Sequence, residues 1–90
     1  MKKTIITVVG KDRVGIIAAV CSFLAENEVN ILDVSQTITG GFFNMMMIVD
    51  VTCSSKPVAS IAEGLDKLAE EIGMQIKMQS EDIFDAMHRV

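Results

Sequence analysis

Apolar and polar residues alternate in blocks along the chain, and the spacing within each block predicts its secondary structure. Residues 2–9 are β-branched and apolar without an interrupting Pro, which predicts a strand that ends at Gly10. Apolar residues then recur at helical spacing from Ile16 to Leu24. We expect Asp12 to cap the N-terminus of this helix, and Asn27 to end it in a left-handed turn.

The middle of the chain predicts a hairpin. Residues 29–39 are strand-like, and strict alternation would place Leu32, Val34, Gln36 and Ile38 on one face and Ile31, Asp33, Ser35 and Thr37 on the other. Gly40 and Gly41 both tolerate positive φ, which favours a tight turn. Residues 42–53 form the next expected strand. Because residues 45–49 are apolar on both faces, this strand is predicted to lie inside the sheet.

The remainder predicts a helix, a strand and a short terminal helix. The first of these helices has Pro57 in its first turn, Gly73 just past its end, and a single apolar stripe at Val58, Ile61, Leu65, Leu68 and Ile72. Gly64, in its middle, costs about 1 kcal/mol relative to Ala, for which close helix–sheet packing is a reason. Residues 74–79 alternate as a strand with one wet face, and Ser80 is placed to cap a helix over residues 81–88.

The resulting order is βαββαβ plus a terminal helix. Two helices on one face of a four-stranded antiparallel sheet, in the strand order 4-1-3-2, give an α+β, ferredoxin-like sandwich. We expect one domain over residues 1–80, with residues 81–90 as its helical extension.

The composition indicates a large amount of apolar surface for so small a domain. Apolar residues make up 50% of only 90 residues, so the chain either enters a membrane or covers apolar surface with a partner. No run approaches the ~20 apolar residues that a spanning helix needs, and no signal core follows the basic start of the chain. We therefore expect a cytoplasmic protein with no membrane contact, and we assign the excess to a second subunit.

Charge and reactive side chains exclude several functions. Net charge is −4, and residues 1–45 are neutral overall, which is atypical of nucleic-acid binding. An RNA-recognition motif is also disfavoured, because no basic residue stands directly before Gly41 and the aromatic pair Phe42-Phe43. Cys21 and Cys53 form no metal-binding motif, and we predict that both are reduced, partly buried thiols. His88, the single histidine, has no evident catalytic partner, so we expect neither an enzyme nor a cofactor.

Two segments could bind a ligand. The turn from Gly10 to Gly15 has a glycine near each end and leads into a helix N-terminus, whose free N–H groups suit a carboxylate. Arg13 could add a charge-assisted hydrogen bond. Asn30 offers a donor and an acceptor to an amino acid, and we expect it on the same side of the domain as the turn. The alternative for the first segment is a tight turn with an Asp cap.

Five segments of the chain form a recognisable combination, namely VVGKDRVGI (8–16), LAE (24–26), VNILD (29–33), QTI (36–38) and FNM (43–45). Through them the chain resembles the ACT domain family, small-molecule regulatory modules of amino-acid metabolism. The resemblance spans residues 3–80 and is closest to small stand-alone bacterial ACT proteins, whose C-terminal ends residues 81–90 also resemble. It extends to the ACT portions of the glycine-cleavage repressor and of formyltetrahydrofolate deformylase.

The resemblance implies a homodimer or larger homo-oligomer with an amino acid bound at the subunit interface. The family's ligand contacts fall on Gly10, Asp12, Arg13, Val14, Gly15, Ile16, Asn30 and Ile31. The chain departs from the family at Val14, where many members have Pro, and at Glu28, where many have Gly. If Glu28 is left-handed, it strains the turn unless Asn27 takes that conformation instead.

These observations predict a non-catalytic regulatory module. It would bind an amino acid and modulate either assembly or a partner, such as a metabolic enzyme or regulator. The alternative is a pure oligomerisation or protein-interaction domain without a ligand. It is motivated by the exposed edge expected for residues 31–39 and by the methionines at 45–47, since Met suits adaptable interfaces.

Overall fold

The computed structural model describes residues 3–80 and divides them into six elements. These are β1 (Lys3–Lys11), α1 (Ile16–Glu26), β2 (Asn30–Thr39), β3 (Phe42–Asp50), α2 (Val58–Ile72) and β4 (Met74–Ser80). The order is the predicted βαββαβ. The helix predicted over residues 81–88 lies outside the described residues.

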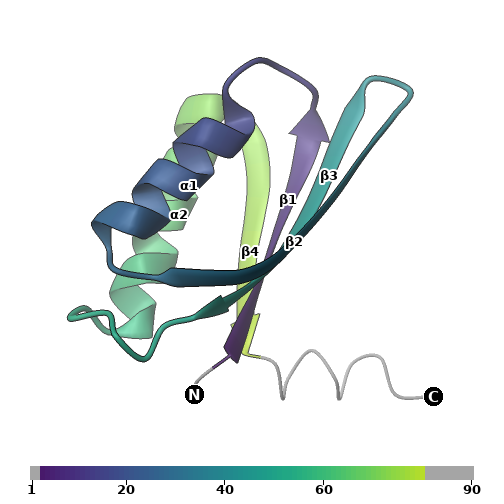
Figure 1. The fold of residues 1–90 in the computed structure, drawn as a ribbon. Helices are drawn as coiled ribbons and strands as arrows, with labels where there is room; N and C mark the ends of the chain where they lie inside the picture. The colour runs from purple at the N-terminus through teal and green to yellow at the C-terminus, as the bar shows by residue number, and fades with distance from the viewer. Residues whose placement is uncertain (1–2, 81–90) are drawn as a thin grey trace.

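The four strands form one antiparallel sheet in the order β2-β3-β1-β4, which confirms the predicted arrangement. Both helices cover the same face of this sheet (Figure 1). The strand with two apolar faces, β3, lies between β2 and β1, as predicted from residues 45–49. Consequently β2 and β4 are the edge strands, and the other face of the sheet is free of both helices.

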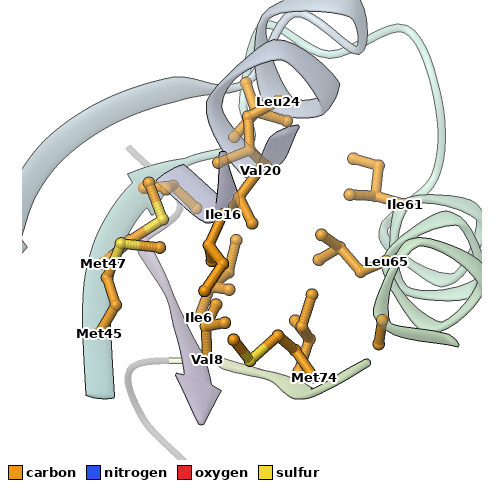
Figure 2. Close-up of a cluster of buried hydrophobic side chains, with 14 of the residues drawn as sticks. Ile6, Val8, Ile16, Val20, Leu24, Met45, Met47, Ile61, Leu65 and Met74 are labelled. Atoms are coloured by element: carbon orange, nitrogen blue, oxygen red, sulfur yellow. The ribbon is translucent and has the colours of Figure 1, made fainter. Parts of the chain in front are cut away.

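The core lies between the helices and the sheet. Side chains from the strands and from both helices point toward one another there (Figure 2). Those with no more than 1% of their surface exposed are Ile6, Val8, Val20, Leu24, Met47, Val49, Ile61 and Leu65. Each such burial is worth about 1.5–3 kcal/mol relative to an exposed position, so this layer dominates the stability of the domain.

The prediction for the faces of β2 is wrong at its start. Ile31 pairs with Val49, yet Asp33 pairs with Ile48, so Leu32 is an extra residue at a β-bulge. A bulge reverses the alternation on one side of it. Ile31 therefore shares the helix-facing side with Val34, Gln36 and Ile38, whereas Asp33, Ser35 and Thr37 face the opposite side. Strict alternation could not reveal the additional residue.

Both helix starts also differ from the prediction. α1 begins after Gly15, which is left-handed (φ 89°) and supplies no side-chain cap, so Asp12 is not the N-cap. β1 instead continues to Lys11, and the Asp12 N–H donates to the Gly41 carbonyl (2.8 Å). Pro57 is the extended N-cap residue of α2, one position before its first turn.

The turn after α1 and the end of β3 give two further corrections. Glu28 takes the left-handed conformation (φ 59°), whereas Asn27 (φ −98°) donates from its side chain to the Phe23 carbonyl (2.8 Å). β3 stops at Asp50, three residues earlier than predicted. There the Asp50 carboxylate accepts a hydrogen bond from the Thr52 N–H (2.9 Å), and this local bond favours a turn over a continued strand.

Gly64 has a different role from the one predicted. A Cβ at this position would lie 2.5 Å from Cζ of Phe23 and 2.7 Å from its Cε2, so the glycine admits a ring from α1. The close approach is helix to helix and not helix to sheet. The predicted left-handed glycines at the hairpin, Gly40 and Gly41, and at the end of α2, Gly73, are confirmed.

Neither helix between residues 3 and 80 has the length and apolar character that crossing a membrane requires.

Candidate functional site

A pocket of about 480 Å³ lies between the start of α1 and the edge strand β2. The β1–α1 turn and the β2–β3 hairpin, which border it, are at the same end of the sheet (Figure 1). The turn and helix contribute Asp12, Arg13, Gly15, Ile16, Ile17 and Ala18, and the hairpin strands contribute Gln36, Ile38 and Phe43. Four of the predicted site residues, Asp12, Arg13, Gly15 and Ile16, thus line one hollow.

Two features fix the backbone of the turn. The hydrogen bond from the Asp12 N–H to the Gly41 carbonyl (2.8 Å) ties the turn to the hairpin. Gly10 lies against the start of β4, where a Cβ would clash with Sδ of Met74. Gly10 therefore packs against β4 and does not line the pocket. Val14, at the tip, is 100% exposed.

The N-terminus of α1 opens into the pocket. Ala19 donates its N–H to the Gly15 carbonyl (2.9 Å), and Gly15 provides no side-chain cap. The N–H groups of the three preceding residues, Ile16 to Ala18, have no acceptor within the helix by its geometry. These residues line the pocket, and a carboxylate is the group that such a helix terminus binds well.

Arg13 faces the pocket and also connects two elements. Its Nη1 donates to the carbonyl of Ile72 (3.0 Å), the last residue of α2. A cation near a helix C-terminus is favourable, because the helix dipole is negative there. The guanidinium has five N–H donors, so this bond leaves further donors for a ligand. Arg13 thus has a structural contact that sequence reasoning did not reveal.

Asn30 and Ile31 lie far from the pocket. At one level of the sheet, Asn30 of β2 pairs with Asp50 of β3, and Asp50 pairs with Lys3 of β1. At the level of the pocket, Ile38 of β2 pairs with Phe43 of β3, and Phe43 pairs with Gly10 of β1. Seven residues of β1 separate these two levels, roughly 23 Å at about 3.3 Å per residue. The expectation that Asn30 and the turn lie on the same side is therefore wrong within one chain, because β2 begins at the opposite end of the sheet from the turn.

Sequence reasoning did not identify five of the pocket residues, namely Ile17, Ala18, Gln36, Ile38 and Phe43. The hairpin contained a signal for the last three. A turn at Gly40-Gly41 sets Ile38 opposite Phe43, and the adjacent register sets Phe43 opposite Gly10. Counting outward from the two glycines would have placed these side chains beside the turn.

Between residues 3 and 80, no group of three or more His, Cys, Asp or Glu could hold a metal ion. Cys21 and Cys53 are free thiols, as predicted, but Cys53 is exposed and not partly buried. His88 is outside the described residues. The pocket is lined by the start of α1, by the polar side chains of Asp12, Arg13 and Gln36, and by apolar side chains.

Comparison with known proteins identifies the fold and its relatives. A sequence model of the ACT domain matches residues 2–79. A UPF0237 protein of Bifidobacterium longum is 52% identical over 90 residues, covering 100% of both chains. The structure of an ACT domain protein from Streptococcus pneumoniae is 37% identical, with a TM-score of 0.81 over 97% of this chain and 98% of that one.

Two larger proteins contain a similar domain, as the sequence resemblance predicted. A formyltetrahydrofolate deformylase from Pseudomonas syringae is 26% identical over 89% of this chain and 28% of that chain, with a TM-score of 0.82. A structure assigned as a glycine cleavage system transcriptional repressor is 26% identical over 88% of this chain and 45% of that one, with a TM-score of 0.73. In both, the similar part is a fraction of a longer chain.

Proposed function

The chain belongs to the ACT domain family, and we propose that it is a non-catalytic regulatory module that binds an amino acid between two copies of itself. ACT domains are generally small-molecule regulatory modules. The observation that carries the proposal is the pocket in which the uncapped N-terminus of α1 faces Gln36 and Ile38 of an edge strand. Binding modulates assembly or the activity of a metabolic enzyme or regulator.

The chemistry of the pocket favours an amino acid. The N–H groups at the start of α1 suit its carboxylate, the Asp12 carboxylate suits its ammonium, and Ile17 and Ile38 provide apolar surface. A volume of about 480 Å³ is within the usual range for ligand sites, and a small amino acid does not fill it. The remaining space is available to groups from a second copy.

The edge strand β2 favours a second copy as the other wall. All of its residues except Ile31 are exposed, including Val34 (43%) and Ile38 (58%). A long exposed edge strand is a template for pairing with another chain. Antiparallel pairing of two β2 strands brings the partner's Asn30 to the hairpin end of the first chain. The partner's Asn30 and Ile31 then lie near Asp12, Arg13, Gly15 and Ile16, so that one site forms from two chains.

Calorimetry tests the proposal. The full chain is titrated with each of the twenty amino acids, and the affinity for any binder is measured again in Asn30→Ala and Gln36→Leu. We expect both substitutions to weaken binding at least tenfold, about 1.4 kcal/mol. Gln75→Leu, an exposed Gln on the other edge strand, is the matched control and should bind normally. No heat and no thermal shift with any amino acid would contradict ligand binding.

The second candidate function is oligomerisation or protein interaction without a ligand. Three exposed apolar residues of β2, Leu32, Val34 and Ile38, favour it, because a dimer through β2 would cover apolar surface whether or not the pocket is filled. Light scattering separates the two functions when it is read beside the calorimetry. A dimer that binds no amino acid supports this candidate, and a monomer at micromolar concentration contradicts both.

A further inference from the structure

A groove of about 300 Å³ lies between α2 and the outer edge of β4, the edge strand opposite β2. It is lined by Ala62, Leu65 and Asp66 of α2 and by the four consecutive residues of β4 from Ile76 to Gln79. The side chains of Ile76 and Met78 face the helices, because their partners on β1 are core residues. Those of Lys77 and Gln79 face the opposite side of the sheet. A groove lined by both sets also reaches the main chain of β4 between them.

The register of the sheet determines which main-chain groups of β4 point into this groove. The Asp12 N–H donates to the Gly41 carbonyl, and these two residues continue the register of β1 with β3. Bonded and non-bonded pairs alternate in an antiparallel ladder, so Thr7, at an odd position, directs its main chain to β4. Thr7 pairs with Lys77, so Lys77 bonds to β1. The two residues that flank Lys77 therefore direct their N–H and C=O groups outward, and among residues 3–80 no strand lies beside that edge.

The flank of α2 above the groove is acidic. At about 100° per residue, Asp66 and Glu70 lie on the side of α2 away from Gly64, the residue that contacts α1. Both acidic residues are exposed, and Lys67, the single cation of α2, lies nearer the α1 side. The side chain of Lys77 leaves β4 from the other face of the sheet. The helix side of the groove therefore presents negative charge.

Asp66 stands over the middle of the free main-chain groups. It is about 10 Å along α2 from Gly73, which follows the helix, at about 1.5 Å per residue. Lys77 is likewise about 10 Å along β4 from Met74, at about 3.3 Å per residue. Because α2 packs against β4 and the two elements join at Gly73 and Met74, Asp66 lies at the level of Lys77.

We propose that β4 binds an extended segment of a partner protein that carries Lys or Arg opposite Ile76 and Met78. The segment adds a fifth strand to the sheet, which is a recurrent mode of peptide recognition. The segment's residues that pair with Ile76 and Met78 direct their side chains toward α2. The aliphatic stem of such a Lys or Arg covers Ala62 and Met78, and its charged group reaches Asp66.

A second copy of this chain fits the groove less well. If two β4 strands paired about a two-fold axis, both α2 helices would lie on the same face of the joined sheet. Their acidic flanks would then meet along the seam, where like charges repel. A basic segment compensates this charge instead. The groove lies on the edge opposite β2, so the proposal does not depend on the proposed amino-acid site.

Selection of displayed random decapeptides on the full chain tests the charge requirement. We expect the enriched peptides to carry Lys or Arg at alternate positions, and a synthetic copy to bind roughly tenfold more weakly to Asp66→Lys. Glu71→Lys is the matched control, because Glu71 is exposed on the α1 side of the same helix, and it should bind normally. Replacing the basic residues of the peptide by Glu should abolish binding to the unmodified chain and restore it to Asp66→Lys. Failure to enrich such peptides, or equal binding to both variants, would overturn the proposal.

Amide hydrogen exchange, measured by NMR, locates the contact on the chain. In the free chain the N–H groups of Ile76 and Met78 should exchange faster than that of Lys77, which bonds to β1. The selected peptide should slow exchange at Ile76 and Met78 several-fold and leave Lys77 unchanged. Protection of these two groups in the free chain that is lost on dilution would show that a second copy occupies the edge. That result rejects the proposal, as does a bound peptide that leaves their exchange unaltered.

Discussion

At the residue scale, Glu28 carries avoidable backbone strain. Its φ of 59° places a residue with a Cβ in the left-handed region, which costs about 1–2 kcal/mol relative to glycine. Replacement by glycine would relieve this strain, but it would also raise the conformational entropy of the unfolded chain, which offsets roughly 0.4–1 kcal/mol of the gain. We expect Glu28→Gly to raise the free energy of unfolding by about 0.5–1 kcal/mol in urea denaturation. Glu28→Ala, which keeps the Cβ, should change it little; equal stabilisation by both would contradict backbone strain as the cause.

Replacing Arg13 should lower the stability of the domain and weaken protection in the last turn of α2. Arg13→Met keeps most of the side-chain volume but removes the hydrogen bond to the Ile72 carbonyl. Since the bond is exposed, we expect a loss of about 0.5–1 kcal/mol in unfolding free energy. Hydrogen exchange should also quicken in the last turn of α2. Unchanged exchange there would show that the contact contributes nothing in solution.

The same residues show how far sequence reasoning reaches. The turn between Gly10 and Ile16 was predictable because its glycines and the apolar spacing that follows them are local features. The contact of Arg13 was not, since its acceptor is 59 residues away and forms only when α2 ends beside the turn. Asn30 was expected beside the turn, but its position depends on which end of the sheet β2 starts from.

At the scale of elements, the contact between α1 and α2 depends on a missing side chain. Gly64→Ala would gain about 1 kcal/mol of helix propensity, but its Cβ would meet the Phe23 ring at 2.5 Å. We expect a net loss of about 1–2 kcal/mol in stability from this overpacking. In a Phe23→Ala background, where the ring is gone, the same substitution should be stabilising. A double-mutant cycle in urea measures the coupling, and additive effects would refute the contact.

Element boundaries were predicted well where one strong local signal exists, as at Gly40, Gly41 and Gly73. They were wrong where a tertiary contact sets the boundary or the pairing of an element. The bulge at Leu32 fits β2 to β3, and periodicity along β2 alone contains no trace of it.

The start of α1 shows the same division between local and tertiary signals. Asp12 has the chemistry of an N-cap, but its N–H is held by the Gly41 carbonyl, and α1 begins only after Gly15. That hydrogen bond joins two turns that are distant in the sequence, so the pattern around Asp12 could not reveal it. The helix itself was still predictable, because the apolar spacing from Ile16 onward is local.

At the scale of the whole molecule, the β2 edge is where we propose that two copies pair. If two copies pair through β2, dissociation is coupled to unfolding, so the melting temperature should rise with protein concentration. Val34→Lys places a charge on the pairing strand and should give a monomer whose melting temperature is independent of concentration. Calorimetric scans over a wide range of protein concentration measure this.

The matched control is Gln75→Lys, which adds the same charge to the other edge strand, β4. It should keep the concentration dependence of the unmodified chain. A dimer that survives Val34→Lys but is lost in Gln75→Lys would place the interface on β4 and contradict the proposed site.

The pairing of Thr4 with Ser80 has a consequence for how such a domain is used. The described chain enters and leaves the sheet at adjacent points, on the two neighbouring strands β1 and β4. A unit built this way can be attached to a host protein, or spliced into one of its loops, without a linker that spans the domain. Its two junctions are nearly coincident, so the host needs to open by little more than the spacing of two strands, about 5 Å.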